Sequence, residues 1–504
     1  MTKLTEESLD FAKEHLEKYY DSDFFPKPFE FEAMWHCWGD VKAFLMASNI
    51  TKFPAFPPFA MVCSKPNGTY RIVHQLDPVN AVCYTAMACL VAPAVENARL
   101  PEASLQACSY RFQLGAGNFF VNNSGYTKYA NRTEELAQGN EWVLATDIVD
   151  FYNQIYLHRL ANAIEYCDHS LKNLGDDIER FVTNVNARTS QGVPVGPVAS
   201  IVMSEALMID IDQFIAQRVP SFTRYVDDIR AFSNDRSALE ELLQELTEYL
   251  YEQHRLTLSS EKTTITKADE FVAEQLHNPY AEERVELFES LEIFNPYSGD
   301  VEEVEIEVDV DQVLEQRLSD TLASVLRMPR LEIGLARALL RRARGRASPI
   351  IAPSLLESLE KFSPVIAEVA LYLDRVFQAH GAQHYTTPVA EVVSSDLMNQ
   401  PLVRYWFEWL TSRHPAFFQD PTINNFISHS SIEHQAQAAV ASANVSWVRA
   451  MKRRIYQLGD RGRRAVIYSA KVLPSDERKH WLNMTIGSTP NVLDKWVAQW
   501  VLES

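Results

Sequence analysis

The chain lacks three features that would each place it in a class of proteins. Its six cysteines lie at positions 37, 63, 83, 89, 108 and 167, and none has the C-x-x-C spacing of zinc or redox motifs. We find neither a signal peptide nor a run approaching about 18 apolar residues. We therefore expect a cytoplasmic protein with reduced thiols, no zinc site, no disulfide framework and no membrane partner.

The chain also lacks the positive charge that is usual for proteins binding nucleic acids. Its net charge is −20, although phosphate binding depends on Lys and Arg. The charge is uneven: −12 over residues 1–268, −15 over residues 269–320 and +7 over residues 321–504. A chain of 504 residues that is 46% hydrophobic should form two or three domains. We place the predicted boundaries at these changes of charge.

What the sequence does contain is a pair of adjacent carboxylates between apolar flanks, in Tyr225-Val226-Asp227-Asp228. The flanking residues predict a β-hairpin with the two acids at or near its tip. Adjacent acids repel each other unless a divalent cation neutralises them. Two Mg²⁺ ions about 3.5–4 Å apart can clamp an in-line phosphoryl transfer. The alternative is a solvated Asp-Asp turn without catalytic function.

A third carboxylate follows a predicted buried strand, residues 142–146, which ends at Asp147. Asp150, Phe151 and Tyr152 come next, and an aromatic ring five residues after the acid could form the wall of a sugar pocket. Asp147 would bind metal together with Asp227 and Asp228. The alternative is that Asp147 caps a helix, a common role for aspartate.

Three further segments could complete a nucleotide site. Residues 191–200 form a Gly/Pro loop before an apolar helix, and Gln191 and Gly192 begin it. Residues 65–73 predict a hairpin with Asn-Gly at its turn and one cation on each arm, Lys65 and Arg71, which suit a triphosphate. Lys262, beyond an amphipathic helix, is a candidate proton donor to the leaving pyrophosphate. Each segment alone is also compatible with an ordinary surface loop.

In this order, the segments resemble the fingers and palm of reverse transcriptases over about residues 61–267. The resemblance implies that Lys65 and Arg71 bind the triphosphate, that Tyr152 excludes a sugar 2′-hydroxyl, and that Gln191 and Gly192 lie under the templating base pair. It also implies dNTPs as substrates and two Mg²⁺ ions on the aspartates. Ser109-Tyr110-Arg111-Phe112 departs from the S-Y-G-F-R segment of intron and retron enzymes, because Arg replaces its Gly.

After the palm, an ordinary reverse transcriptase has a basic thumb, whereas residues 269–320 are the most acidic part of this chain. Beyond them, amphipathic periodicity predicts an all-helical domain resembling an α-solenoid over residues 321–504. This domain contains basic clusters at 337–346 and 452–464 with nearby aromatic residues. They indicate either solvated helix faces or a site for single-stranded nucleic acid.

A palm without an ordinary thumb, followed by helices, resembles the abortive-infection (Abi) reverse transcriptases of bacterial phage defence, and the likeness extends to their prophage-borne member. The fold class we expect is α+β: a fingers-palm domain without an ordinary thumb, followed by an all-α HEAT-like domain. The family implies cytoplasmic homo-oligomers, trimers or larger, that synthesise DNA without a template. It also implies priming from a side-chain hydroxyl, which leaves single-stranded DNA covalently attached.

For the priming residue we favour Tyr20, then Tyr19, within residues 16–25. This segment could be a mobile arm that reaches the cleft, and a phenol is deprotonated more easily than a serine. The alternative is that both rings pack against the fingers. Two other functions stay open for the whole chain: a templated RNA-directed DNA polymerase of the retron or intron type, and a non-catalytic helical scaffold.

Overall fold

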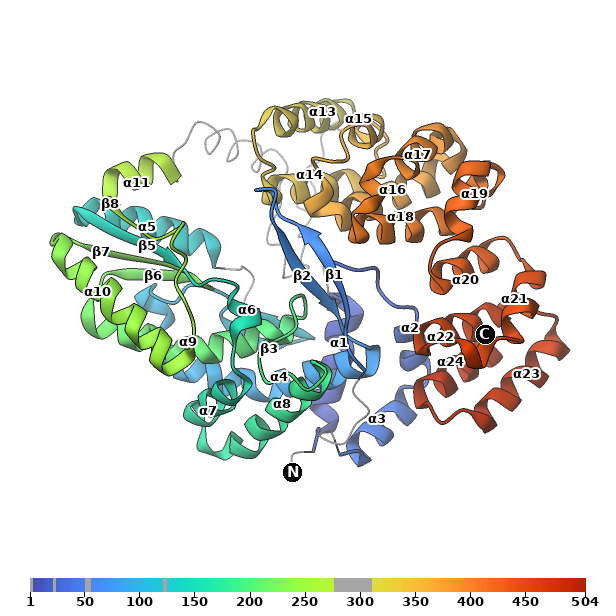
Figure 1. Cartoon of the computed structure of the whole chain (residues 1–504), viewed down its shortest axis with the longest axis horizontal. Coiled ribbons are helices and arrows are strands. Elements are labelled where there is room, and N and C mark those ends of the chain that lie inside the picture. The colour runs from blue at the N-terminus through green and yellow to red at the C-terminus, as the bar shows by residue number, and fades with distance from the viewer. Residues whose placement is uncertain (1–2, 21–23, 50–55, 121–124, 276–310) are drawn as a thin grey trace.

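The structure is a computed structural model that describes residues 3–20, 24–49, 56–120, 125–275 and 311–504. The sheet that carries the predicted acidic residues has four antiparallel strands in the order β6-β7-β5-β8 (Figure 1). The strands are β5 (Trp142–Asp147), β6 (Phe222–Tyr225), β7 (Asp228–Ser233) and β8 (Thr264–Lys267). The predicted strand over residues 142–146 is confirmed, and four consecutive residues of β5 are buried.

Helices cover both faces of this sheet, which explains why β5 has no polar face. α10 (Arg236–Tyr249) packs with β5, β7 and β8 on one face, where Leu144 and Ala231 join Leu239 in one core. α5 (Tyr126–Gly139) and α11 (Ala268–Gln275) cover the other, where Val143 joins Phe232. The alternation of side chains along a strand sends successive residues of β5 into these two cores.

The fingers region combines helices with two short hairpins. Its elements are α1 (Glu6–Lys18), α2 (Glu30–His36), α3 (Trp38–Ala47), β1 (Phe59–Ser64), β2 (Tyr70–Gln75), α4 (Pro78–Ala98), β3 (Phe112–Gly115), β4 (Asn118–Phe120), α6 (Phe151–Gln154), α7 (Leu157–Cys167) and α8 (Lys172–Val185). The predicted hairpin over residues 65–73 is confirmed: β1 pairs with β2, and Gly68 at its turn has φ +79°.

Helix α4 corrects the expectation that no segment approaches a membrane span. By length and composition it is the one helix in the described part of the chain that could cross a membrane, with a mean hydropathy of 1.5 over 18 residues. Yet 78% of that window is buried inside the protein, where α4 packs against α1 and α9 (Val198–Arg218). A helix that is apolar on all sides can equally be the centre of a protein core.

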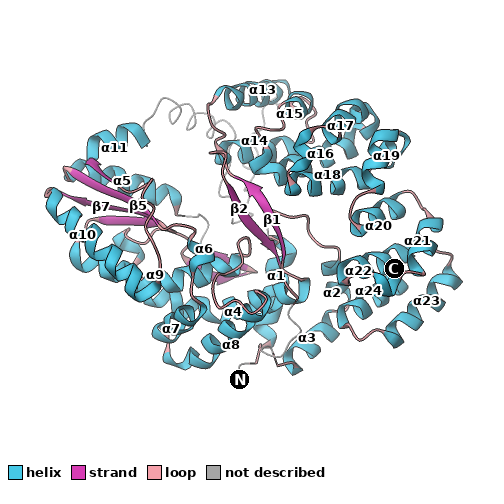
Figure 2. Cartoon of the chain, viewed as in Figure 1, coloured by secondary structure: helices cyan, strands magenta, loops and turns pink. Residues whose placement is uncertain are grey.

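Residues 321–504 are helical, as predicted, and Figure 2 shows strands only in the preceding part of the chain. The first of these helices begins earlier, at Asp311, inside the predicted acidic connector, residues 276–310 of which lie outside the described residues. The helices are α13 (Asp311–Arg327), α14 (Ile333–Gly345), α15 (Ala352–Glu357), α16 (Ile366–His380), α17 (Thr386–Val393), α18 (Pro401–Arg413), α19 (Pro421–Ser428), α20 (Ile432–Ala441), α21 (Val445–Lys452), α22 (Asp460–Ser469), α23 (Ser475–Ser488) and α24 (Val492–Glu503). Alternate helices pack in a row: α14 on α16, then α18, α20, α22 and α24. Pro353 and Pro401 lie in the first turns of their helices, where a missing N–H costs little.

The hydrophobic cores do not follow the predicted boundary at residue 320. One core unites the palm, α1–α4 and the last helices, from α20 to α24. A second core unites α13–α19 with Phe25, Cys63 and Val73, the last two from the inner side of the β1–β2 hairpin. The helical region therefore packs on the fingers at two places.

Candidate active site

The three aspartates of the predicted metal site meet at one end of the palm sheet. Asp147 is the last residue of β5, Asp228 is the first residue of β7, and the two pair directly across the strands. Asp227 lies in the turn between β6 and β7, and its carbonyl oxygen accepts a hydrogen bond from the amide of Ile148 at 3.3 Å. The predicted hairpin with the acids at its tip is confirmed. The alternative of a helix cap at Asp147 is wrong.

The hairpin turn depends on a strained residue. Val226 has φ +56°, a left-handed conformation that is unusual for a β-branched side chain. Its carbonyl oxygen accepts a hydrogen bond from Arg224 Nη1 at 2.7 Å. Arg224 has an exposed fraction of 0%, and its guanidinium also bonds Asp212 at 2.6 Å and Glu205 at 3.0 Å. This buried arginine therefore fixes the turn that carries Asp227.

A buried ion network extends behind Arg224, and the sequence analysis missed it. Glu205 also pairs with Arg99 at 2.9 Å and accepts a hydrogen bond from the Ser109 hydroxyl at 2.6 Å. Glu205 and Asp212 are seven residues, or two turns, apart in α9, so they face the same way. Two acids at this spacing in an apolar helix, with an arginine beside the catalytic hairpin, were the signal available in the sequence.

Burial and mutual repulsion set the electrostatics of the site. Burial, followed by the charge of Asp147, raises the pKa of Asp227 to about 7. Burial also raises the pKa of Asp228, and the nearby Arg230 opposes this shift. Lys262 Nζ lies 2.5 Å from Asp147 Oδ2. Partial burial lowers the pKa of Lys262, but its hydrogen bond and charge interaction with Asp147 outweigh burial and raise that pKa.

These carboxylates fit a divalent metal in chemistry and in backbone placement. Burial is the main cause of the raised pKa of Asp227, and the charge of Asp147 adds to it; a hard cation would offset both effects. With the side chains as they stand, no group of three His, Cys, Asp or Glu residues in the described chain surrounds a single point. Lys262 holds Asp147, and Arg230 lies 3.5 Å from Asp228. Metal binding therefore requires side-chain rotation at these residues.

The predicted sugar wall lies on the short helix α6, directly after the first acid. Asp150 precedes the helix with φ +49°, and its carboxylate accepts a hydrogen bond from Asn153 Nδ2 at 2.7 Å. Phe151 is buried, whereas Tyr152 is only half-buried. Phe151 thus anchors the helix in the core and leaves part of the Tyr152 ring accessible.

The Gln191-Gly192 loop holds α6 in place. The Gly192 amide donates to the carbonyl of Ile155 at 2.8 Å, and the Val193 amide donates to the carbonyl of Tyr152 at 2.9 Å. The side chain of Gln191 donates to Gln154 Oε1 at 2.8 Å. Gly192 has φ +87°, and a Cβ there would lie 3.1 Å from the carbonyl oxygen of Asn153. Glycine is needed because two backbones meet here.

The structure places the two predicted triphosphate ligands on the β1–β2 hairpin. Lys65 is exposed at the turn, whereas Arg71 is half-buried with its guanidinium 4.7 Å from the centre of the Phe24 ring. The hairpin is tied to the Gly/Pro loop by His74, whose amide donates to the Val195 carbonyl at 2.8 Å. The fingers hairpin, this loop and α6 thus form one connected support.

The predicted priming tyrosines lie beside α1 and the fingers hairpin. The Tyr20 hydroxyl accepts a hydrogen bond from Gln75 Nε2, and its ring packs on Phe31 with centroids 6.0 Å apart. The Tyr19 hydroxyl is buried and has no hydrogen-bond partner among the described residues. Residues 21–23 lie outside the described residues. The predicted mobile arm, residues 16–25, is anchored at both of its ends. Leu16 is buried in α1, and Phe25 is buried in the second core.

Residues 63–283 match the family model described as "Reverse transcriptase (RNA-dependent DNA polymerase)". This chain contains a reverse transcriptase domain. The domain makes the protein a nucleotidyltransferase of the polymerase class. Its matched region contains the three aspartates, Lys262, α6 and the Gly/Pro loop.

Among solved structures, the chain is similar to two yeast telomerases. One is "Structure of telomerase from Candida albicans in complexe with TWJ fragment of telomeric RNA": TM-score 0.33, 12% identity, 78% of this chain and 69% of that chain covered. The other, apo telomerase from Candida tropicalis, has a TM-score of 0.35 and 10% identity, with 74% of each chain covered. Similarity at this level gives no information about activity. No curated protein matches the chain.

Proposed function

We propose that this protein is a metal-dependent DNA polymerase that extends DNA without a template, in bacterial defence against phage. The observation that carries the polymerase chemistry is the pairing of Asp147 with Asp228 beside Asp227 at the end of the palm sheet. Asp147, Asp227 and Asp228 would hold two Mg²⁺ ions. When bound, these ions would activate the attacking hydroxyl and neutralise charge on the transferring phosphate.

The remaining residues of the site would position the nucleotide. Tyr152 lies on α6, five residues after Asp147, and would contact the sugar. Lys65 and Arg71 would bind phosphate oxygens from the fingers hairpin. Lys262 stays protonated beside Asp147 because its pKa is raised, so it can stabilise negative charge on a leaving pyrophosphate and then donate a proton.

The charge distribution supports synthesis without a template. Residues 269–320, which follow the palm in sequence, carry a net charge of −15, and negative charge of this density repels duplex. An enzyme that holds no template–primer duplex needs another acceptor for its first nucleotide. A side-chain hydroxyl, with Tyr20 first and Tyr19 second, would stay near the acids at high effective concentration. Tyr20 would first have to release its hydrogen bond with Gln75.

The defence role, the homo-oligomeric state (trimer or larger), the cytoplasmic location and the HEAT-like character of the helices rest on the resemblance to Abi reverse transcriptases. The packing of alternate helices from α14 to α24 agrees with a HEAT-like array. A templated polymerase of the retron or intron type is the second candidate, because the palm site would serve it equally well.

The decisive experiment incubates purified protein with Mg²⁺ and labelled dNTPs, without template or primer. We expect polymer formation that EDTA stops and that Asp227→Asn abolishes. Mass spectrometry of the digested protein after reaction with one dNTP should find a nucleotide on Tyr20 or Tyr19. Synthesis only after addition of an RNA template would favour the second candidate. DNA released intact by denaturation would contradict protein priming, and polymerisation by Asp227→Asn protein would refute the metal site.

A further inference from the structure

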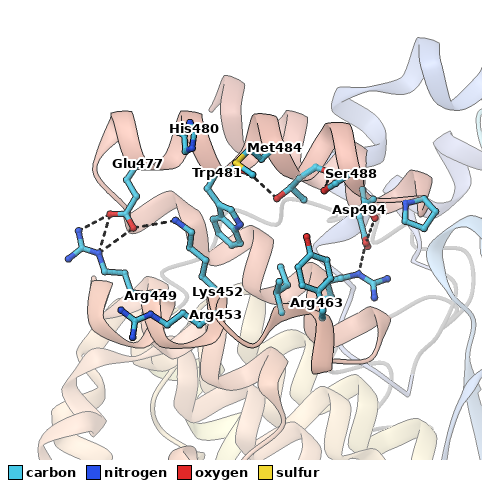
Figure 3. Close-up of a pocket in the computed structure, with 15 residues that line it drawn as sticks. Arg449, Lys452, Arg453, Arg463, Glu477, His480, Trp481, Met484, Ser488 and Asp494 are labelled. Carbon is cyan, nitrogen blue, oxygen red and sulfur yellow. Dashed lines mark hydrogen bonds and ion pairs between the residues drawn. The ribbon is translucent and has the colours of Figure 1, made fainter.

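A large pocket lies in the last part of the helical region. In the view of Figure 1, helices α21–α24 and the palm sheet lie on opposite sides of the molecule. The pocket has a volume of about 890 Å³ and is formed by α21, α22, α23 and α24 (Figure 3). That volume falls within the range of sites that hold a nucleotide-sized ligand. The polymerase chemistry does not use this pocket.

The pocket has a surplus of positive charge in a strongly acidic protein. Four Arg or Lys side chains line it, against two carboxylates. Glu477 is shared by Arg449 at 2.7 Å and Lys452 at 3.5 Å, so one acid neutralises only part of two cations. Asp494 has an exposed fraction of 0%, and its carboxylate forms an ion pair with Arg463 Nε at 2.5 Å. Figure 3 shows both carboxylates turned toward these cations.

Arg453 provides the unpaired cation. Its side chain is exposed at the pocket, and no residue in the described chain forms a hydrogen bond or ion pair with it. An unpaired arginine offers a planar fork that can bind a phosphate through two parallel hydrogen bonds. His480 is also exposed on the pocket wall.

The same pocket presents flat and apolar groups to solvent. The Tyr456 side chain is 86% exposed, and Met484 is 61% exposed. Trp481 is buried at the pocket wall with Lys452 Nζ 5.2 Å from its ring centre. An exposed aromatic ring in the same pocket as an unpaired cation is the combination that binds nucleic-acid bases by stacking and phosphates by charge.

We propose that this pocket binds a nucleoside phosphate unit of single-stranded DNA, with the base against Tyr456 and Met484 and the phosphate at Arg453. The identity of the strand as the enzyme's own product rests on the proposed function. A free nucleotide shares this chemistry and would occupy the same position.

Cross-linking tests the location of binding independently of synthesis. The full-length protein is irradiated with a synthetic oligothymidylate that contains photoreactive 5-iododeoxyuridine, and the modified peptides are mapped. We expect a cross-link at Tyr456 that Tyr456→Ala removes. Excess unlabelled oligonucleotide should abolish it, whereas abolition by dNTP alone at equal concentration would identify a free nucleotide as the ligand and overturn the assignment to a strand. Cross-links confined to residues 63–283 would refute the proposal.

Fluorescence anisotropy with the same oligonucleotide tests the charge. Arg453→Glu should weaken binding about tenfold and make the dependence on salt shallower by about 0.7 units of log-log slope, because one phosphate contact is lost. Tyr456→Ala should weaken binding about tenfold with an unchanged salt slope, because it removes stacking. The matched control is Arg375→Glu, an equal charge reversal at an exposed residue outside the pocket and outside both basic clusters, which should change affinity less than twofold. Equal effects of Arg453→Glu and Arg375→Glu would refute a specific site.

These outcomes are separable from the proposed polymerase. A protein that binds the oligonucleotide at Tyr456 but makes no polymer with Mg²⁺ and dNTPs would support the pocket and contradict the proposed synthesis. A protein that makes polymer but never cross-links at Tyr456 would support the proposed synthesis and contradict the pocket.

Discussion

At the scale of single residues, the site depends on a backbone conformation that its own residue disfavours. Val226 adopts φ +56° between Tyr225 and Asp227, and such strain costs on the order of 1–3 kcal/mol and persists only where the surroundings enforce it. Arg224 supplies the enforcement through its bond to the Val226 carbonyl and its two buried acids. We therefore assign Arg224 a positioning role: it sets where the Asp227 carboxylate lies.

Substitution of Arg224 by Lys should separate positioning from folding. Lys keeps the positive charge opposite Glu205 and Asp212 but cannot bond both acids and the Val226 carbonyl at once. We expect kcat for dNTP incorporation to fall at least about tenfold with less than about a threefold change in KM, since misplaced groups lower kcat. Arg236→Lys, at an exposed i,i+4 pair with Glu240, is the matched control. A folded Arg224→Lys protein with normal kcat would show that the turn does not need this contact.

At the scale of elements, hairpins and strand ends that a local sequence pattern specifies were predicted. Features that depend on contacts between distant parts of the chain were missed. The β6–β7 hairpin, the end of β5 and the β1–β2 turn were predictable, because alternating apolar residues and Asn-Gly specify them locally. The Arg224 network was missed because its members come from the C-cap of α4, from α9 and from β6, far apart in sequence. The burial of Phe25, near Tyr20, was not predictable because this ring packs against Tyr405 of α18, which follows hundreds of residues later.

Helix α6 also shows how one element depends on another. It has four residues, too few to be stable alone, and the Gln191-Gly192 loop holds it through backbone hydrogen bonds. Helix α6 and the Gln191-Gly192 loop therefore determine together where the Tyr152 ring lies. The sequence of the helix alone does not.

Removal of the Tyr152 ring should change sugar selection. If the ring lies beneath the incoming sugar, it rejects a 2′-hydroxyl by steric clash, so Tyr152→Ala should raise the ratio of rNTP to dNTP incorporation at least about tenfold. Incorporation of each nucleotide is compared between the variant, the wild type and Tyr166→Ala, a change at a tyrosine that is 64% exposed on α7. An unchanged ratio in Tyr152→Ala would place the sugar elsewhere.

At the scale of the whole molecule, polar contacts reinforce the two places where helices and fingers pack together. Arg464 of α22 is 1% exposed at its side chain and pairs with Glu30 and Asp77, both at 2.9 Å. Arg461 pairs with Glu433 and donates to Gln75 at 3.0 Å. These arginines belong to the basic cluster at 452–464, but they bind the C-terminal helices to the fingers and do not form a surface for nucleic acid. Within that cluster, Arg453 and its neighbours face outward instead.

Loss of Arg464 should destabilise the protein in a pH-dependent way. Burial raises the pKa of Glu30, and Arg464 opposes that shift, so Arg464→Met leaves buried acids uncompensated at a cost of about 3–5 kcal/mol. The pKa of Glu30 then rises further above its unfolded value. Stability is retained at low pH, where the acid is protonated, and is lost as pH rises.

Thermal unfolding measures this effect. The melting temperature of Arg464→Met should lie well below that of the wild type at pH 8, and the difference should narrow toward pH 5. Arg346→Met, at an exposed position, should match the wild type at both pH values. An equal deficit at pH 5 and pH 8 would mean that packing, and not the buried acids, accounts for the loss.

The second core, which the β1–β2 hairpin shares with later helices, has a consequence for folding during synthesis on the ribosome. The inner side of the β1–β2 hairpin is covered by helices as late as α18. Synthesis runs at about 5–20 residues per second, so the hairpin emerges on the order of tens of seconds before its cover is made. During that interval Cys63 and Val73 have no core to enter, and the strand edges are open to other nascent chains. The fingers of this polymerase can therefore become complete only after α18 has been synthesised.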